Sequence, residues 1–114
     1  MTATYSDPPS ERRGEPRQST RVQLKFKFDG EEQSGDAVDL GFGGVGMQTE
    51  VEIPEGAPLE LTLAIPSDSG QVQVRLRGRV RWSLASMIGV WRYGIGFDAL
   101  GPRQRAILAK YLSR

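Results

Sequence analysis

Hydrophobic and polar positions alternate along much of the chain. Residues 21–28 read RVQLKFKF, with an apolar side chain at every second position. The same period of two runs through residues 59–65 and, at greater length, through residues 72–82. Because successive side chains of a β-strand point to opposite faces, this pattern predicts half-buried antiparallel strands. Gly78 interrupts the apolar series of the longest run, where we expect a bend or bulge in a curling sheet.

Three shorter strands complete the prediction. Residues 36–40 and 45–51 flank a cluster of glycines, and residues 91–97 place aromatic and aliphatic side chains on one face. Proline and glycine mark turns in residues 54–58 and 66–70. Six strands that follow one another at intervals of roughly 8–15 residues favour a small barrel over an open sheet.

A single helix is predicted at the C-terminal end. Pro102 suits a first helical position, where the missing N–H would have no partner. An apolar stripe accompanies it at Leu100, Ile107, Leu108, Tyr111 and Leu112. Because a helix of about a dozen residues is marginal alone, we expect it to dock on an open end of the barrel. The predicted fold class is mainly β, a six-stranded antiparallel barrel with one C-terminal α-helix.

Composition narrows the range of functions. The length of 114 residues predicts one domain, and the chain contains no histidine and no cysteine. The commonest general base, the commonest metal ligands and every thiolate are therefore missing. We expect no catalytic site, no metal site and no enzyme activity. No uncharged stretch approaches the ~20 residues of a membrane span, and the polar N-terminus lacks a signal sequence. We therefore expect a cytoplasmic protein without membrane insertion.

The net charge of +1 conceals three blocks of different sign. Residues 1–28 carry six basic and three acidic side chains, residues 29–70 carry ten acidic and no basic ones, and residues 71–114 carry nine basic and one acidic. Such asymmetry indicates either an anion-binding face or oppositely charged strands that pair across the sheet. Four arginines line one face of the longest strand, but its aromatic residue is predicted on the other face. We therefore do not expect nucleic acid as the partner.

Two segments carry side chains suited to an anionic ligand. The segment ERRGEPR contains Arg12, Arg13 and Arg17 in a stretch that glycine and proline keep out of regular structure. Guanidinium groups form bidentate bonds to phosphate or to guanine. The segment DLGFGG places Asp39 ahead of glycines that allow close approach to the backbone. The alternatives are a solvated terminal tail and a tight turn that serves the curvature of the barrel.

In combination these segments resemble the PilZ domain family. RGEPR at 13–17, then a strand, DLGFGG at 39–44, and RYGIGF before a short helix follow that family's order over residues 11–113. The hallmark of the family is an RxxxR loop before the first strand and (D/N)xSxxG on the next strands. The resemblance implies a six-stranded antiparallel split barrel. It divides the chain into a disordered tail (1–10) and one PilZ-like domain (11–114), with an arginine loop (11–20), a barrel (21–98) and a helix (101–113).

The resemblance also implies a site for cyclic di-GMP, which many members of the family bind with this motif pair. Two arginines occupy the RxxxR positions and a third lies just upstream, while the motif serine is replaced by glycine. A tryptophan matches a position where some members place an aromatic near the ligand. The alternation of the strand, however, predicts that this tryptophan points into the core. The implied ligand-binding residues are Arg12, Arg13, Arg17, Asp39, Gly41, Gly44 and Trp82.

The expected function is that of a bacterial second-messenger receptor or adaptor. It would bind cyclic di-GMP and pass the signal by contact to an unidentified downstream protein. The alternative is a degenerate PilZ domain that binds no nucleotide and acts only as a protein-interaction adaptor. Gly41 bears on this choice, because one lost neutral hydrogen bond costs ~0.5–1.5 kcal/mol. The apolar segment 83–90, SLASMIGV, either folds over the barrel end or forms an exposed patch for a partner.

Overall fold

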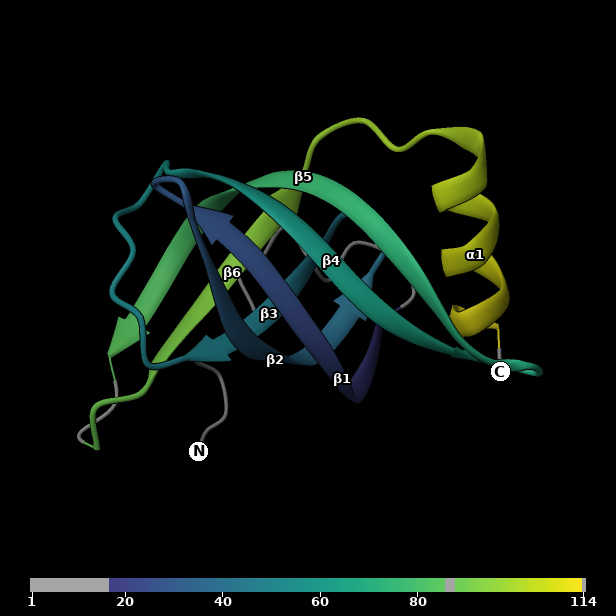
Figure 1. Cartoon of the computed structure of the whole chain (residues 1–114), viewed down its shortest axis with the longest axis horizontal. Coiled ribbons are helices and arrows are strands. Elements are labelled where there is room, and N and C mark those ends of the chain that lie inside the picture. The colour runs from purple at the N-terminus through teal and green to yellow at the C-terminus, as the bar shows by residue number, and fades with distance from the viewer. Residues whose placement is uncertain (1–16, 86–87, 114) are drawn as a thin grey trace.

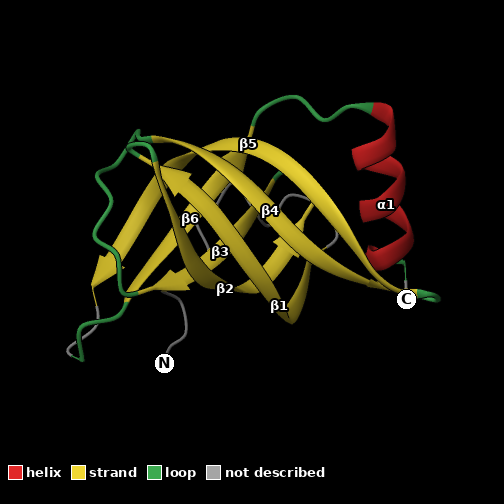
Figure 2. Cartoon of the chain, in the orientation of Figure 1, coloured by secondary structure: helices red, strands yellow, loops and turns green. Residues whose placement is uncertain are grey.

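Six strands form a closed barrel, and one helix stands beside it (Figures 1 and 2). The computed structural model describes the backbone of residues 17–85 and 88–113, and the side chains of that part from Val22 on. The order around the barrel is β1-β2-β3-β6-β5-β4, and all neighbouring strands are antiparallel. The elements are β1 (Arg17–Phe28), β2 (Glu31–Gly41), β3 (Gly44–Thr49), β4 (Pro58–Ser67), β5 (Gly70–Ala85), β6 (Trp91–Phe97) and α1 (Pro102–Leu112). The predicted fold class is confirmed.

Several strands extend beyond the alternating pattern that predicted them. β1 begins at Arg17 rather than at residue 21, because its first residues pair with the end of β2 ahead of a register shift between Ser19 and Val22. β2 reaches back to a tight hairpin turn at Asp29 and Gly30, whose φ angles are 55° and 84°. Positive φ at both central positions is the geometry of a type I′ turn, which Asp-Gly favours. This turn sets the register of the β1–β2 pair.

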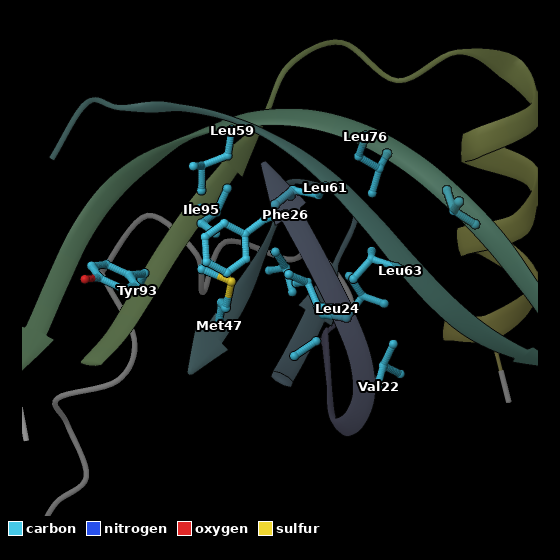
Figure 3. Packing of buried hydrophobic residues seen from close by; sticks show 14 of the residues in the cluster. Val22, Leu24, Phe26, Met47, Leu59, Leu61, Leu63, Leu76, Tyr93 and Ile95 are labelled. Carbon is cyan, nitrogen blue, oxygen red and sulfur yellow. The ribbon is translucent and has the colours of Figure 1, made fainter. Parts of the chain in front are cut away.

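The inward-facing side chains of the strands fill the barrel. Alternate residues of β1 and β4 meet in the centre, where Phe26 and Leu61 are directly opposed and each is 1% exposed. Figure 3 shows these side chains together with others from β3, β5 and β6. Fully burying a side chain of this size stabilises the fold by about 1.5–3 kcal/mol. These side chains occupy the interior of the barrel.

Tyr93 connects the core to the loop between β3 and β4. Its hydroxyl accepts a hydrogen bond from the backbone N–H of Ile53 at 2.7 Å and donates one to the carbonyl of Val51 at 2.8 Å. Burial raises the pKa of this phenol above its usual 10.0, since the charged form would lose its hydration. The neutral hydroxyl therefore anchors a loop that has no regular structure of its own.

Helix α1 lies at one end of the barrel, next to the β4–β5 hairpin (Figure 1). Its buried side chains are Leu108, Tyr111 and Leu112. The ammonium group of Lys110 lies 3.3 Å from the carboxylate of Asp68 in the hairpin turn. Within residues 17–85 and 88–113, no helix has the length and apolarity needed to cross a membrane.

The connection between β5 and β6 exposes apolar side chains. β5 continues to Ala85, so residues 83–85 belong to the strand rather than to a loop. Leu84 is 46% exposed and Ile88 is 83% exposed, which excludes a fold-back of these two side chains over the barrel end. Residues 86–87, which include Met87, lie outside the described part. Of the two predictions for this segment, the exposed patch fits these two side chains.

Candidate ligand-binding face

The outer face of β2, β3 and β6 is rich in glycine. Leu40, Val45 and Ile95 point into the core, so the residues that alternate with them point outward. These outward positions are Gly41 on β2, Gly44 and Gly46 on β3, and Gly94 and Gly96 on β6. We call this surface the glycine face. Both strand-motif glycines that the sequence singled out lie on it.

Asp39 lies flat against the glycine face. It pairs with Gly46 across the β2–β3 ladder. A β-carbon placed on Gly46 would lie 2.7 Å from one carboxylate oxygen of Asp39 and 3.0 Å from its Cγ. Any side chain at this position would therefore push the carboxylate away from the sheet. Gly46, which the sequence reasoning did not assign to the site, thus positions the motif acid.

Trp82 lies on the outer face, and the predicted core position for it is wrong. The β5–β6 register shifts between Val80 and Trp82, so the alternation of β5 is reset at this bulge. Trp82 consequently pairs with the outward-facing Gly94 and covers it with the pyrrole ring of its indole. The indole is half-buried, and its N–H has no hydrogen-bond partner among the described residues.

Arg81, the residue before Trp82 in the bulge, likewise places its side chain against a glycine of β6, which is Gly96. A β-carbon placed on Gly96 would lie 2.5 Å from Nε of Arg81 and 3.2 Å from its Cγ. Asp39, Trp82 and Arg81 therefore each rest on a glycine of the neighbouring strand. The result is a shallow surface on which an acid, an indole and a guanidinium are held close to the backbone.

Gly44 leaves room for the backbone of the neighbouring strand, whereas Gly46, Gly94 and Gly96 leave room for side chains. A β-carbon placed on it would collide with the carbonyl oxygen of Ile95 in β6. Backbone cannot yield as the end of a flexible side chain can, so the β3–β6 pair at this point depends on glycine. The nearby carbonyl of Gly43 accepts a hydrogen bond of 2.9 Å from the N–H of Phe97, which ties the motif turn to the end of β6.

The arginine motif enters the barrel beside the glycine motif. Arg17 is the first residue of β1, and its backbone pairs with Gly41, the residue that replaces the motif serine. Two residues on, Ser19 pairs with Asp39. The two sequence motifs are therefore adjacent through their backbones at this end of the β1–β2 ladder. Arg12 and Arg13 lie outside the described residues.

Arg92 is a further cation on this outer surface that the sequence reasoning did not single out. It pairs with Gln48 of β3 and Leu84 of β5, one row from Gly94. Its side chain is half-buried. The signal was readable in WRYGIGF, where the apolar residues occupy one face and Arg92, Gly94 and Gly96 occupy the other.

Charge pairing between β4 and β5 does not explain the basic strand. Glu60 pairs in register with Arg77, yet no described acidic side chain of β4 lies within 4.0 Å of a β5 guanidinium. Arg79 instead donates a hydrogen bond of 3.2 Å to the carbonyl of Gly56. Among the described residues, no three or more His, Cys, Asp or Glu side chains are grouped to hold a metal ion.

Comparison with known proteins identifies the fold and the family. The family model described as PilZ domain matches residues 11–114. Similar solved structures include the Bacillus subtilis inhibitor of motility MotI/DgrA, at 16% identity, a TM-score of 0.77 and coverage of 90% of this chain and 50% of that one. The K. pneumonia MrkH–c-di-GMP complex is also 16% identical, with a TM-score of 0.65 and coverage of 89% and 51%.

A third similar structure is the PilZ domain of CeSA from a cellulose-synthesizing bacterium, at 14% identity, a TM-score of 0.58 and coverage of 85% of this chain and 94% of that one. This chain spans about half the length of the first two structures. No curated protein sequence matches it. The family model covers nearly the whole chain, and the observed barrel and helix have the fold of these structures. The chain belongs to the PilZ domain family.

Proposed function

We propose that this protein is a receptor or adaptor that binds cyclic di-GMP on the glycine face and passes the signal on by protein contact. The observation that carries the proposal is the placement of Asp39 and Trp82 in one row across four strands, each seated on a glycine. Family membership supports it, as does the fold shared with MrkH, which has been solved in complex with c-di-GMP.

The ligand's chemistry matches the side chains of this face. Cyclic di-GMP presents two phosphates and two guanines. The carboxylate of Asp39 accepts hydrogen bonds from the N1 and N2 donors of a guanine. The arginines of the segment 11–17 supply bidentate donors for the phosphates or for a guanine edge. The backbone of Arg17 is held at this place, because it pairs with Gly41 across the β1–β2 ladder.

Trp82 provides a surface on which a guanine can stack. Stacking of a base on an aromatic side chain contributes about 1–3 kcal/mol. The indole N–H is buried without a partner among the described residues, and such a donor costs about 1–3 kcal/mol. A ligand atom that accepts a hydrogen bond from this N–H would remove that cost. Trp82 can therefore contribute to binding both by stacking and through this donor.

Gly41 weakens the proposed site without dismantling it. The family's serine would add one hydroxyl at this place, worth ~0.5–1.5 kcal/mol of hydrogen bonding. The residue's pairing with Arg17 is through the backbone and does not depend on a side chain. We therefore expect binding that is up to about tenfold weaker than with serine.

The second candidate function is that of an adaptor that needs no nucleotide. The exposed side chains of Leu84 and Ile88 favour it, since exposed apolar side chains suit a protein contact. In this case the glycine face would serve only the packing of β3 against β6.

Calorimetric titration of cyclic di-GMP separates the two functions. The wild-type protein is compared with Asp39→Asn and with Asp36→Asn, which changes the same charge on the same strand three residues away. We expect the Asp39→Asn variant to bind at least about tenfold more weakly, because an amide cannot accept as a charged carboxylate does. Asp36→Asn should bind as the wild type does. Absence of heat with the wild type at tens of micromolar protein would contradict the receptor function.

A further inference from the structure

A second binding surface lies on the side of the barrel opposite the glycine face. The ring order places β4 opposite β3. A groove of about 380 Å³ crosses the outer face of β1, β4 and β5 and is bordered on one side by Asp98, Ala99 and Gln104. We call it the polar groove. The charged and polar side chains that matter for its chemistry are Lys25, Lys27, Glu60, Thr62, Arg75 and Arg77.

Two rows of side chains cross the polar groove. In the first row, Lys25 of β1 and Arg75 of β5 flank Thr62 of β4. In the second row, Lys27 and Arg77 flank Glu60. The four cations are exposed, and Thr62 is half-buried. The first row therefore holds two cations with no acid between them, whereas the second row contains its own counter-charge.

The cations of the groove are not neutralised by contact pairs. Within the described part of the chain, no carboxylate lies within 4.0 Å of Lys25, Lys27, Arg75 or Arg77. Opposite charges that only face each other across a sheet contribute little, about 0.2–1 kcal/mol each. The charges are thus available to an external anion at little cost to the fold.

The far wall of the groove is held in place by hydrogen bonds. The N–H of Asp98 donates to the carbonyl of Arg77 at 2.8 Å, where the chain that leaves β6 runs beside β5 (Figure 1). The side chain of Gln104 accepts from the N–H of Gly101 at 2.6 Å and donates to the carbonyl of Arg75. The groove is therefore a built feature in which the first turn of α1 is fastened to β5.

We propose that the polar groove binds an acidic, extended segment of a partner protein. Residues two apart in a strand are separated by about 6.6–6.8 Å, which is the spacing from Lys25 to Lys27 and from Arg75 to Arg77. An extended peptide with carboxylates at alternate positions has the same period. One carboxylate lies over Thr62 between Lys25 and Arg75, and the next meets the outer cations of the second row.

The interleaved acids favour a peptide over a nucleic-acid strand. Glu60 lies in the middle of the second row, and Glu32 and Asp98 also line the groove. A continuous phosphate backbone would be repelled at each of them, whereas a glutamate side chain of a peptide can turn its carboxylate away from Glu60 and toward Lys27 or Arg77. In addition, the one aromatic side chain of the lining, that of Phe26, is 1% exposed and points into the core. It offers no face on which bases can stack.

The inference deepens the proposed function by naming the class of partner. It rests on that function only where it identifies the acidic segment as part of the downstream protein. The test uses fluorescence anisotropy with a labelled peptide of alternating glutamate and serine, about ten residues long so that it spans the groove. A peptide with glutamine in place of glutamate and a short oligothymidylate are measured beside it. We expect only the glutamate peptide to bind measurably.

Variants of the chain locate the binding. We expect Lys25→Gln with Arg75→Gln to weaken binding at least about fivefold, and Glu60→Gln to tighten it about twofold, because an acid inside the groove is removed. The control is Arg103→Gln with Lys110→Gln, which removes the same charge from α1 outside the groove. It should bind within about twofold of the wild type.

Three results would overturn the inference: equal binding of the glutamine peptide, equal weakening by the control pair, or tighter binding of the oligothymidylate. The same proteins are titrated with cyclic di-GMP. Peptide binding without nucleotide binding would overturn the proposed receptor function and leave the groove assignment in place. Nucleotide binding without peptide binding would overturn the groove assignment and leave the proposed receptor function in place.

Discussion

The glycine face and the polar groove are opposite sides of one barrel, built from the same alternation of residues in two different ways. On the glycine face, Gly46 of β3 and Gly94 and Gly96 of β6 carry no side chain, so Asp39, Trp82 and Arg81 lie directly against the backbone of these strands. In the polar groove, every outward position of the two rows carries a side chain that stands up from the sheet. The first surface suits a flat ligand and the second suits an extended segment.

The two surfaces also differ in how rigidly their chemistry is fixed. On the glycine face Asp39 and Trp82 are half-buried, and each is held against a glycine of the neighbouring strand. The indole N–H of Trp82 lacks a partner among the described residues. The charged side chains of the groove are exposed and held only by their register. Substitutions should therefore have large effects on the glycine face and small effects in the groove.

The largest expected effect of this contrast is on stability. Gly44→Ala should lower the free energy of unfolding by about 3 kcal/mol, because the β-carbon meets the backbone carbonyl of Ile95 and the strands must separate. Thr62→Ala, at an outward position of the groove, should cost about 0.5 kcal/mol. Urea denaturation of both variants measures the difference. Equal losses would show that the two faces do not differ in this way.

The next effect is on nucleotide affinity. Trp82→Ala should weaken binding of cyclic di-GMP by about 30-fold, the equivalent of about 2 kcal/mol of stacking. Leu84→Ala is the control, since Leu84 lies further along the same strand and is exposed. Calorimetry on both variants tests whether the bulge in β5 places Trp82 for the ligand. Wild-type affinity in Trp82→Ala would remove this residue from the site.

Gly94→Ala tests the contact between Trp82 and Gly94 without removing the indole. Its β-carbon would collide with the Trp82 ring, which has to move as a rigid body. We expect about a tenfold weaker affinity for cyclic di-GMP, since part of the stacking contribution is lost. Gly101→Ala is the control, because a β-carbon there has only the Gln104 amide oxygen nearby, at 3.5 Å. If both variants bind cyclic di-GMP equally well, the contact with Gly94 does not position Trp82 for binding.

Restoring the motif serine has a smaller and opposite effect. Gly41→Ser should tighten binding of cyclic di-GMP about two- to tenfold, through one added hydrogen bond. The measurement is the same titration at matched ionic strength. A weaker affinity would mean that glycine at this position is required by the ligand rather than tolerated by it.

The smallest expected effect tests whether the glycine face and the polar groove act independently. Lys25→Gln with Arg75→Gln should change the affinity for cyclic di-GMP by less than about twofold, because charges farther apart than the Debye length of ~8 Å are screened. The protein measures 24 Å along its shortest axis. A larger change would show that the surfaces are coupled through the barrel.

Much of the fold was readable from the alternation of apolar residues. The core residues of β1, β4 and β6 occupy the positions that the period of two assigned to one face. Pro102 begins α1 as predicted. The early start of β1 was missed because residues 17–20 carry no apolar alternation, and the pairing of Ser19 with Asp39 is a backbone effect. The predicted domain boundaries and the roles of Arg12 and Arg13 stay predictions.

The site was only partly readable. Asp39, Gly41 and Gly44 were identified from the sequence, and the structure places them on one face with Trp82. The orientation of Trp82 was wrong because a bulge adds one residue to a strand without a mark in the hydrophobic pattern. The sequence reasoning assigned no role to Gly94 and Gly96. Their role depends on the side chains of a neighbouring strand, which no local pattern contains.

The central claim is that cyclic di-GMP binds on the glycine face, and backbone and indole NMR signals followed during a titration test it most directly. We predict shifts of the indole N–H signal of Trp82 and of the amides of Gly41, Gly46 and Gly94, while the amides of Thr62 and Arg75 in the polar groove stay unchanged. Shifts centred on the groove, or no shifts at saturating ligand, would contradict the claim.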